Sequence, residues 1–458
     1  MSNILILGAG RVGASVAEQL VAEHYHVTVV DENPIALKAL QDRLDLRTVL
    51  GHAANPSVLE AAGVMDADLL LAVTPTDELN LTACKIAYTL FRVPKRLARI
   101  RSADLLAHPQ LLNDDGFAVD HAITPAQIVT DYLVRLVQTP EALQVLEFAD
   151  GRAQLVVVRA EEGAPMAGRP LSRLKELLPK TDCRVVGLYR RNHTVYPDGA
   201  TVVEAGDEIF VLAARQHLRA VIATFHAAER KIRRVLIAGG GNVGQRVAAA
   251  LQDECQVKVI ESDRERATQL AEALPRVLVL AGDATDETLL DTEQIDRTDL
   301  YIALTSDDED NIMSGLLAKQ MGARKVIAII NRSRYVGLLQ GGRIDVALSP
   351  AEATIGSLLA FVRRGDVAAV HSLRRGASEA MEIVAHGSRS TSRIVGRRIE
   401  ELRLPEGIRF GAIVRGEQVI IVHHETVIED GDHVIVFADS KRRVPEVEKL
   451  FAVKLGFL

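Results

Sequence analysis

The stretches ILILGAGRVG (residues 4–13) and VLIAGGGNVG (residues 235–244) decide the fold of this chain, and they begin 231 positions apart. In each, a short apolar run predicts a strand, a GxGxxG turn follows, and the next stretch is amphipathic and predicts a helix. Such a turn is typical of dinucleotide-binding folds, where one glycine allows the tight turn, one allows close approach of phosphate and one allows helix packing. The helix N-terminus then faces the phosphate. The sequence therefore predicts the same nucleotide-binding turn twice.

The identity between the two stretches continues far beyond the glycines. Five further pairs of identical residues keep the spacing of 231: Gly51 and Gly282, Asp68 and Asp299, Thr74 and Thr305, Asn80 and Asn311, and Arg101 and Arg332. A later block repeats at a spacing of 225, because VEAGDEIFVLA (203–213) matches IEDGDHVIVFA (428–438). This pattern indicates duplication of a whole structural unit rather than of a motif.

Each repeat has a larger part followed by a smaller one. In the larger part, apolar runs such as ILIL, HVTVV and DLLLAV alternate with helical stretches, which predicts a parallel sheet with crossover helices. The smaller part is rich in strand-like runs around one short helix and predicts an α+β domain. We therefore expect an α/β chain with two tandem Rossmann-like domains, 1–124 and 232–349, each followed by a small α+β domain, 144–228 and 369–453. Helical links begin at Pro125 and Pro350.

An acidic residue ends the second predicted strand of each larger part, Asp31 in the first and Glu261 in the second. Such an acid accepts hydrogen bonds from ribose hydroxyls and repels a 2′-phosphate, so NADP is disfavoured. The candidate ligand residues of the turns are Gly8, Ala9, Gly10, Arg11, Val12 and Gly13, and Gly239, Gly240, Gly241, Asn242, Val243 and Gly244. This fingerprint does not separate NAD or NADH from ATP or ADP. The alternative interpretation is that the glycines serve packing alone and that the acids are ordinary polar strand ends.

Two further positions distinguish the copies. Arg99 ends a predicted strand and could pair with a phosphate, whereas its counterpart is Ile330. Thr74 and Thr305 each follow an apolar strand and are candidate lining residues. The alternatives are that Arg99 is a solvated strand-end charge and that the threonines open the next helix. The first site is thus the stronger candidate for a dinucleotide.

Composition and motifs exclude several other classes of protein. A net charge of −7 gives no global attraction to nucleic acid or anionic lipid. The longest apolar runs are short of the roughly 20 residues that cross a bilayer, the start of the chain predicts no signal peptide, and three widely spaced cysteines suit a reducing cytoplasm. The acidic run 305–310 begins a helix and is interpreted as an N-cap rather than a cation site. We therefore expect no metal site, and no hydrolase or P-loop motif predicts a catalytic residue.

The chain resembles the TrkA family, the cytosolic regulatory subunits of bacterial Trk potassium-uptake systems. The segments GAGRVG, VVDEN, DEIFVLAA, AGGGNVG and VHSLRRG agree with its pattern of two tandem RCK units. The resemblance implies that Gly8 through Val12, Asp31, Thr74 and Arg99 bind the first ligand. Gly239 through Val243, Glu261 and Thr305 correspond to them in the second copy, where Ile330 departs from the first copy.

The resemblance also implies how such a chain acts. It implies a homo-oligomeric ring, peripheral on the cytoplasmic face of the inner membrane, that binds NAD or NADH and also ATP or ADP and controls potassium flux through an integral-membrane Trk subunit. No enzymatic turnover is expected. The alternatives are an NAD-dependent oxidoreductase and a nucleotide sensor with a soluble partner. The first is disfavoured because only about 85 residues follow each larger part, fewer than a catalytic domain usually needs.

Overall fold

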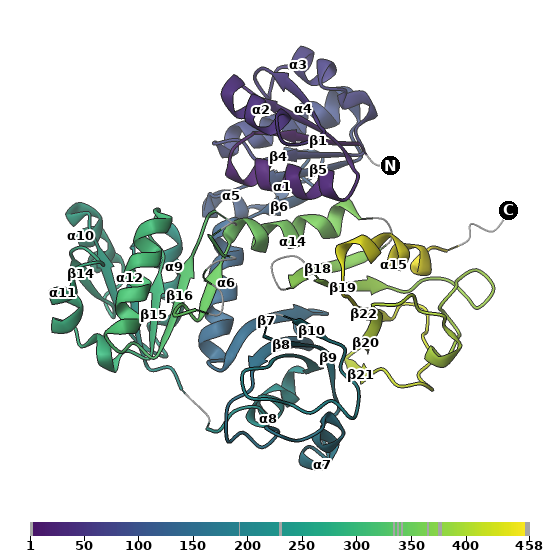
Figure 1. Ribbon diagram of the computed structural model, residues 1–458. Coiled ribbons are helices and arrows are strands. Elements are labelled where there is room, and N and C mark those ends of the chain that lie inside the picture. The colour runs from purple at the N-terminus through teal and green to yellow at the C-terminus, as the bar shows by residue number, and fades with distance from the viewer. Residues whose placement is uncertain are drawn as a thin grey trace. The chain divides into compact units, whose positions relative to one another are not determined.

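Figure 1 shows a computed structural model of the chain, which describes residues 3–191, 193–228, 231–332, 335–336, 339, 342–363, 366–373 and 378–453. Part of the VHSLRRG segment, residues 374–376, lies outside these ranges. The chain forms two compact units, residues 1–128 with 350–358 and residues 129–349 with 359–458. None of the helices within the described ranges has the length and apolar character that crossing a bilayer requires.

The first unit is built on a six-stranded parallel sheet with the order β3-β2-β1-β4-β5-β6 (purple in Figure 1). Its strands are β1 (Asn3–Leu7), β2 (His26–Asp31), β3 (Arg47–Leu50), β4 (Leu69–Ala72), β5 (Lys95–Arg99) and β6 (His121–Ile123). The order reverses between β1 and β4, and at such a point the carboxyl ends of parallel strands leave a crevice for a ligand. The predicted Rossmann-like sheet is confirmed, and its crevice lies directly above the first glycine turn.

Helices bury both faces of this sheet. They are α1 (Arg11–Ala22), α2 (Pro34–Gln41), α3 (Pro56–Ala61), α4 (Asp77–Phe91) and α5 (Ala103–Leu106). Leu5 and Leu7 pack in one core with Leu59 of α3 and Cys84 of α4. Because side chains alternate along a strand, the buried residues at positions 4 and 6 point to the opposite face. This double burial explains why the first strand is apolar at every position from 4 to 7.

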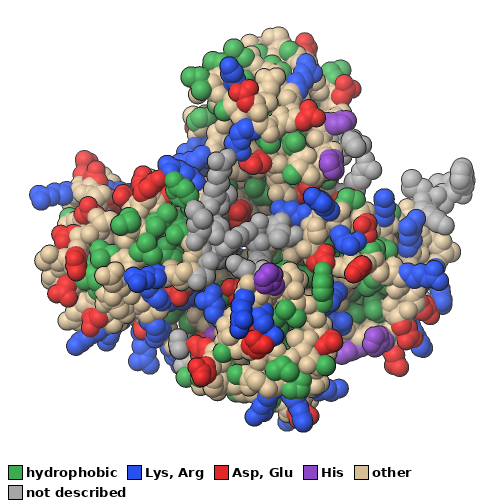
Figure 2. Space-filling view, in the orientation of Figure 1, with side chains coloured by type: hydrophobic (Ala, Val, Ile, Leu, Met, Phe, Trp, Pro, Cys, Tyr) green, Lys and Arg blue, Asp and Glu red, His purple; other side chains and the backbone are tan. Residues whose placement is uncertain are grey.

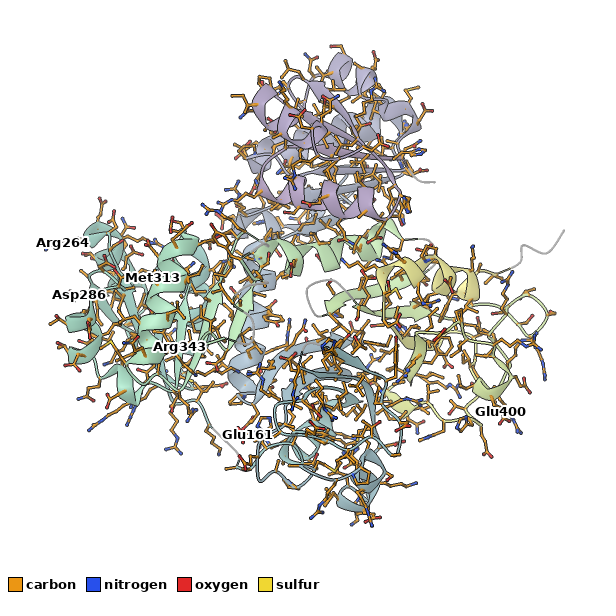
Figure 3. The ribbon with its side chains drawn as sticks, viewed as in Figure 1. Glu161, Arg264, Asp286, Met313, Arg343 and Glu400 are labelled. Carbon is orange, nitrogen blue, oxygen red and sulfur yellow. The ribbon has the colours of Figure 1, made fainter. Side chains whose placement is uncertain are left out.

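The second parallel sheet repeats the first, with the order β14-β13-β12-β15-β16-β17. Its strands are β12 (Arg234–Ala238), β13 (Gln256–Glu261), β14 (Leu278–Ala281), β15 (Leu300–Ala303), β16 (Lys325–Ile329) and β17 (Val346–Leu348). Its helices are α9 (Asn242–Leu251), α10 (Arg264–Ala273), α11 (Glu287–Thr292) and α12 (Asp308–Gln320). Asp286, which is labelled in Figure 3, is the N-cap of α11. Its side chain accepts a hydrogen bond from the Thr288 amide. Identical sheet order in both copies confirms the duplication that the sequence predicts.

The acidic run 305–310 begins α12. Asp307 is the N-cap of this helix, and its side chain accepts a hydrogen bond from the Asp310 amide at 3.0 Å. The N-cap interpretation is therefore confirmed. Within the described part of the chain, no group of three or more His, Cys, Asp or Glu side chains is arranged to hold a metal ion.

The smaller parts form two five-stranded antiparallel sheets, ordered β10-β9-β11-β8-β7 and β18-β19-β22-β20-β21. The first contains β7 (Ala142–Phe148), β8 (Ala153–Arg159), β9 (Cys183–Arg190), β10 (His193–Val195) and β11 (Glu208–Ala214), with α7 (Leu174–Leu177) and α8 (Leu218–Ala223). The second contains β18 (Val367–Leu373), β19 (Ser378–Val384), β20 (Ile408–Arg415), β21 (Gln418–Ile421) and β22 (His433–Ala438), with α15 (Val444–Phe451). The links that begin at Pro125 and Pro350 are the helices α6 (Pro125–Gln138) and α14 (Pro350–Val362).

The two antiparallel sheets share one hydrophobic core. Phe210 and Leu212 of the first pack in the same cluster as Ile435 and Phe437 of the second. Polar contacts tie them as well, since the Ala149 amide donates to Glu382 Oε2 at 2.7 Å. The sequence predicts them as separate units, but each sheet has an apolar face that its own short helices cover only in part, so the two faces bury one another.

Candidate functional site

The first glycine turn joins β1 to α1, and its three glycines meet different surroundings. Gly8 has φ +111°, and a Cβ there would lie 3.0 Å from the Val73 carbonyl oxygen. A Cβ on Gly13 would lie 1.9 Å from the Gly8 carbonyl oxygen, so that position admits only glycine. A Cβ on Gly10 would meet nothing within 4 Å. Packing therefore explains Gly8 and Gly13, whereas Gly10 borders open space in front of the helix.

The N-terminus of α1 faces that open space. Gly10 is the N-cap of the helix, and no side chain provides a capping hydrogen bond. Arg11 and Val12 are the first helical residues, so their amides belong to the first turn, which carries the positive end of the helix dipole. This arrangement suits an anion such as a phosphate.

Asp31 lies at the carboxyl end of β2 and holds the turn in place. Its Oδ2 accepts a hydrogen bond from the Ala9 amide at 2.6 Å, and its Oδ1 accepts one from the Asn33 amide at 2.8 Å. Each carboxylate oxygen has a second lone pair, so it can still accept a bond from a ribose hydroxyl. Asp31 thus stabilises the conformation of the glycine turn and can also bind a ribose.

Thr74 and Arg99 lie at the carboxyl ends of β4 and β5 and are linked by Asn80. The Thr74 amide and hydroxyl both donate to Asn80 Oδ1, at 2.8 and 2.7 Å, and Asn80 Nδ2 donates to the Arg99 carbonyl at 2.9 Å. Arg99 Nη2 in turn donates to the Thr74 carbonyl. Thr74 does not open the next helix, which begins at Asp77. Sequence analysis pairs Asn80 with Asn311 but gives neither a role; their identity in both repeats was the available signal.

The guanidinium of Arg99 is partly desolvated at this edge of the sheet. Burial lowers its pKa, the nearby Arg101 lowers it further, and Asp77 raises it. Its Nε is buried and has no hydrogen-bond partner among the described residues. An arginine with an unused donor and incomplete charge compensation is suited to receive an anionic group.

The second turn repeats this backbone geometry, with the neutral Asn242 where the first turn has Arg11. Gly239 has φ +100°, a Cβ on Gly244 would lie 2.0 Å from the Gly239 carbonyl oxygen, and a Cβ on Gly241 would meet nothing within 4 Å. Glu261 Oε2 accepts from the Gly240 amide at 2.8 Å, as Asp31 does for Ala9. Asn242 and Val243 begin α9 at this turn. The loop and the acid are therefore equivalent in the two copies.

The Arg99 position differs in the second copy, and another cation lies near the loop. The Thr305 amide donates to Asn311 Oδ1 at 2.8 Å, as the Thr74 amide does to Asn80. The predicted counterpart of Arg99, Ile330, is wrong by one position, because the chain between Asn311 and β16 is one residue shorter than that between Asn80 and β5. Asn311 Nδ2 donates to the Ile329 carbonyl as Asn80 Nδ2 does to the Arg99 carbonyl, so the buried Ile329 takes the place of Arg99. Arg266 of α10 donates through Nε to the Gly240 carbonyl at 3.1 Å and through Nη2 to Gln245 Oε1 at 2.7 Å. Sequence analysis missed Arg266, because its counterpart in the first copy is Ala36 and the repeat comparison gave no signal there.

The structure thus brings each predicted set of residues together at the carboxyl edge of its own parallel sheet. In the first copy these are the turn Gly8–Gly13, Asp31, Thr74 and Arg99, and in the second the turn Gly239–Gly244, Glu261 and Thr305. The arrangement offers backbone donors for phosphate and a carboxylate for ribose. Side chains of both charges are intermixed on the face that Figure 2 shows, which does not resemble the single-sign patch of a polyanion-binding protein.

Known proteins match this chain along most of its length. The family model of the TrkA-N domain matches residues 4–125 and 235–350, and that of the TrkA-C domain matches residues 155–226 and 389–452. The chain is 51% identical over 455 residues to the Trk system potassium uptake protein TrkA of Halomonas elongata, which covers 99% of this chain and 100% of that protein. It is 50% identical over 457 residues to the protein of the same name from Vibrio alginolyticus, covering 100% of both.

Two solved structures share the fold. The structure described as "GsuK channel bound to NAD" has a TM-score of 0.63 at 19% identity and covers 98% of this chain and 79% of that chain. The GsuK RCK domain has a TM-score of 0.62 at 19% identity and covers 98% of this chain and 95% of that chain. The predicted fold class, with tandem Rossmann-like and RCK-type small domains, is confirmed. Since both domain models match twice and relatives about half identical span its length, the chain belongs to the TrkA family of Trk system potassium uptake proteins.

Proposed function

We propose that this chain is a non-enzymatic regulatory subunit of a potassium-uptake system, and that nucleotide binding at its glycine turns sets its activity. The proposal rests on the relatives that are named potassium uptake proteins and that are 51% and 50% identical to it. The ligand of the first turn is NAD or NADH, and ATP or ADP are further ligands of the chain. Among the similar folds, one structure is described as bound to NAD and another as bound to ADP.

One observation carries the proposal: the open space at Gly10 lies in front of an uncapped helix N-terminus. A pyrophosphate placed there meets the first-turn amides of α1, and Asp31 reaches the ribose of the adenosine half. Arg99, whose side chain is only partly buried, supplies positive charge at this edge of the sheet. Gly8, Ala9, Arg11, Val12, Gly13 and Thr74 complete the first site through their backbone or lining positions.

The second turn, Gly239–Gly244 with Glu261 and Thr305, binds a nucleotide less tightly or a different one. Ile329 stands where the first site has Arg99, so that positive charge is absent, and the guanidinium of Arg266 approaches from α10 instead. Because Arg266 approaches the loop from α10 and not from β5, it favours a ligand whose phosphates are placed differently from those of a dinucleotide. ATP or ADP, with their charge concentrated in one chain of phosphates, fit this position better than a dinucleotide.

Regulation then requires that the ligand bind one conformation of the protein more tightly than another. We propose that the chain forms a homo-oligomeric ring on the cytoplasmic face of the inner membrane, against an integral-membrane Trk subunit that translocates potassium. The helices α6 and α14, which begin at Pro125 and Pro350, connect each parallel sheet to its antiparallel partner. They are the candidates for transmitting the change.

Potassium uptake at limiting external potassium, in cells that lack the chain, tests this function. Wild-type complementation is expected to restore uptake, and Gly10→Ala is expected to lose the nucleotide-dependent part of it. Gly10→Ala is a sharper probe than Asp31→Ala, because Asp31 also holds the Ala9 amide. Unimpaired uptake in the absence of the chain would refute the proposal.

Two further measurements separate the alternatives. Co-purification with a membrane potassium transporter distinguishes the proposal from a sensor with a soluble partner. Steady loss of NADH absorbance with a candidate substrate, far beyond one equivalent of protein, would favour an oxidoreductase instead.

A further inference from the structure

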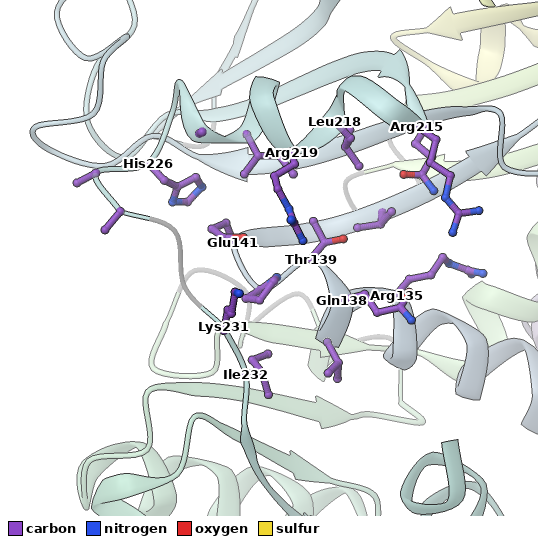
Figure 4. A pocket seen from close by; sticks show the side chains of 18 of the residues that line it. Arg135, Gln138, Thr139, Glu141, Arg215, Leu218, Arg219, His226, Lys231 and Ile232 are labelled. Carbon is purple, nitrogen blue, oxygen red and sulfur yellow. The ribbon is translucent and has the colours of Figure 1, made fainter. Parts of the chain in front are cut away.

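A pocket of about 620 Å³ lies in the second compact unit, and none of its lining residues belongs to either glycine turn. It is bounded by β7 of the first antiparallel sheet, by α8, by the C-terminal end of α6, and by residues 226–228 and 231–232 (Figure 4). Pockets that hold small organic molecules commonly have volumes of about 300–1,000 Å³. Its size therefore suits a small metabolite.

The charged residues of this pocket are mainly basic, although the whole chain carries a net charge of −7. Arg135, Arg215, Arg219 and Lys231 line it, against the two acids Glu141 and Glu147. In Figure 4, Arg219 extends from α8 toward Thr139, and Arg135 enters from the end of α6. Four cations against two acids make the pocket attractive to an anion.

One of these arginines, Arg135, has one nitrogen in an ion pair and another without a hydrogen bond to any described residue. Arg135 Nη1 contacts Glu147 Oε2 at 3.1 Å, whereas its Nε is buried without a hydrogen-bond partner among the described residues. The walls also include buried apolar side chains, notably Val145 and Ile222. A ligand that matches both the basic side chains and the apolar walls carries a strong anionic group and an apolar or planar body.

The second repeat treats the equivalent position differently. Because α6 and α14 begin at corresponding prolines, and β8 and β19 pair alike, Gln138 corresponds to Arg363 and Gln154 to Glu379. Arg363 and Glu379 form an ion pair at 2.8 Å whose side chains are both 0% exposed. In the first repeat both positions are neutral glutamines that line the pocket. In the second copy, therefore, the buried ion pair occupies the place at which the first copy has its pocket.

Two cations of the pocket have no cationic counterpart in the second copy. Since α8 and α15 begin at Leu218 and Val444, Arg219 corresponds to Pro445, and Arg135 of α6 corresponds to Ala360 of α14. Arg215 corresponds to Lys441 and keeps its charge. Duplication alone therefore does not account for Arg135 and Arg219.

We propose that this pocket is an effector site, separate from the glycine turns, that binds a small phosphate monoester with an apolar or planar body. The planar guanidinium groups of Arg135, Arg215 and Arg219 suit phosphate oxygens. Val145 and Ile222 contact the organic part.

The pocket is connected to the second parallel sheet. Lys325, the first residue of β16, donates through Nζ to the carbonyl oxygens of Pro140 and Ala142, both at 2.8 Å. Pro140 is part of the pocket wall. A ligand that shifts this wall therefore acts on the sheet that carries the second glycine turn.

Phenyl phosphate is a suitable probe, because it has the anionic group and the apolar body but no adenosine. Its binding to the full-length chain is measured by ligand-observed NMR and calorimetry, beside phenol and inorganic phosphate. We expect phenyl phosphate to bind at least about tenfold more tightly than either fragment, which corresponds to about 1.4 kcal/mol. The double variant Arg215→Ala with Arg219→Ala should weaken it at least about tenfold, since it removes two guanidinium groups that bind the phosphate oxygens.

The matched control is Arg173→Ala, which removes an exposed arginine of the same small domain that pairs with Glu176 at the surface. It should leave phenyl phosphate binding unchanged. A second test rebuilds the second repeat's ion pair with Gln138→Arg and Gln154→Glu, which should abolish phenyl phosphate binding while NADH binding persists.

Three results would overturn the proposal. They are no binding of phenyl phosphate, equal binding by the arginine variants and wild type, or binding that Gly10→Ala removes and the pocket variants do not. The last result would place the phosphate at the first glycine turn. NADH binding measured in the same samples reports on the glycine turns independently.

Discussion

Replacing Gly10 by alanine separates the two explanations of the first glycine turn. The backbone at Gly10 has φ −67° and ψ −178°, which alanine adopts without strain, and the added Cβ meets nothing within 4 Å. A Gly→Ala change at a compatible position stabilises by about 0.4–1 kcal/mol through the unfolded chain, whereas alanine is a poorer N-cap than glycine by a similar amount. We therefore expect the free energy of unfolding to change by less than about 1 kcal/mol.

Ligand affinity should change much more. The new methyl group occupies the space through which a phosphate approaches the first-turn amides of α1. Losing one hydrogen bond to a charged group costs about 1.5–3 kcal/mol, which is a loss of affinity of about 10- to 150-fold. If two such bonds are lost, the effect is larger than this range.

The assay is fluorescence of bound NADH, which is simple to interpret because the chain contains no tryptophan that would transfer energy to it. Gly241→Ala is the matched control, because its Cβ also meets open space, but in the second copy. It should leave NADH affinity unchanged if the first turn is the dinucleotide site. A folded Gly10→Ala protein that binds NADH as tightly as wild type would refute the reasoning, because the turn would then serve packing alone.

Three other changes test the surroundings of the sites. Arg99→Ile gives the first copy the residue of the second and should weaken NADH binding about tenfold or more, measured by the same fluorescence titration; unchanged affinity would remove Arg99 from the site. Asn80→Ala leaves the Thr74 amide and the Arg99 carbonyl without their partner and should cost about 2–5 kcal/mol in urea unfolding, while a loss below about 1 kcal/mol would contradict its bridging role. Burial lowers the pKa of Lys325 from 10.5 to about 8, so between these values the unfolded chain binds more protons and wild-type stability should rise with pH. Relative to Lys325→Met, the wild type should gain about 1–2 kcal/mol from pH 7.5 to 9.5, and a constant difference would show that this pKa is not lowered.

The parallel sheets were predictable because their information is local and occurs twice. An apolar run buried on both faces, a glycine turn and an acid at the next strand end are each visible in the sequence, and repetition at 231 residues removes chance matches. Asn80 was within reach of the same reasoning, since an uncharged polar residue kept in both copies inside an apolar helix needs a buried partner. It received no role because a sequence shows that a residue is kept but not which backbone groups it joins.

The antiparallel parts were less predictable for a physical reason. Their shared core depends on contacts between segments far apart in the sequence, such as the Tyr189 hydroxyl with the Ser378 hydroxyl, 189 positions later, at 2.8 Å. The local pattern of apolar residues does not specify which apolar face packs against the apolar face of each antiparallel sheet. The basic pocket is also made by residues from α6, α8 and the segment before β12, and it could be recognised only when these were placed together.

The inequality of the two glycine turns follows from charge rather than from loop shape. Both loops have a left-handed first glycine, a last glycine in contact with the first, and an acid that accepts a hydrogen bond from the second residue of the turn. Because these features are the same in both copies, they cannot make one turn bind a different nucleotide from the other. The choice must come from the cations, and these lie on different elements: Arg11 at the start of α1 and Arg99 on β5 in the first copy, and Arg266 on α10 in the second. A ligand with two separated phosphates and one with a single polyphosphate chain would meet these charges differently, so two nearly identical loops can report on two different nucleotides.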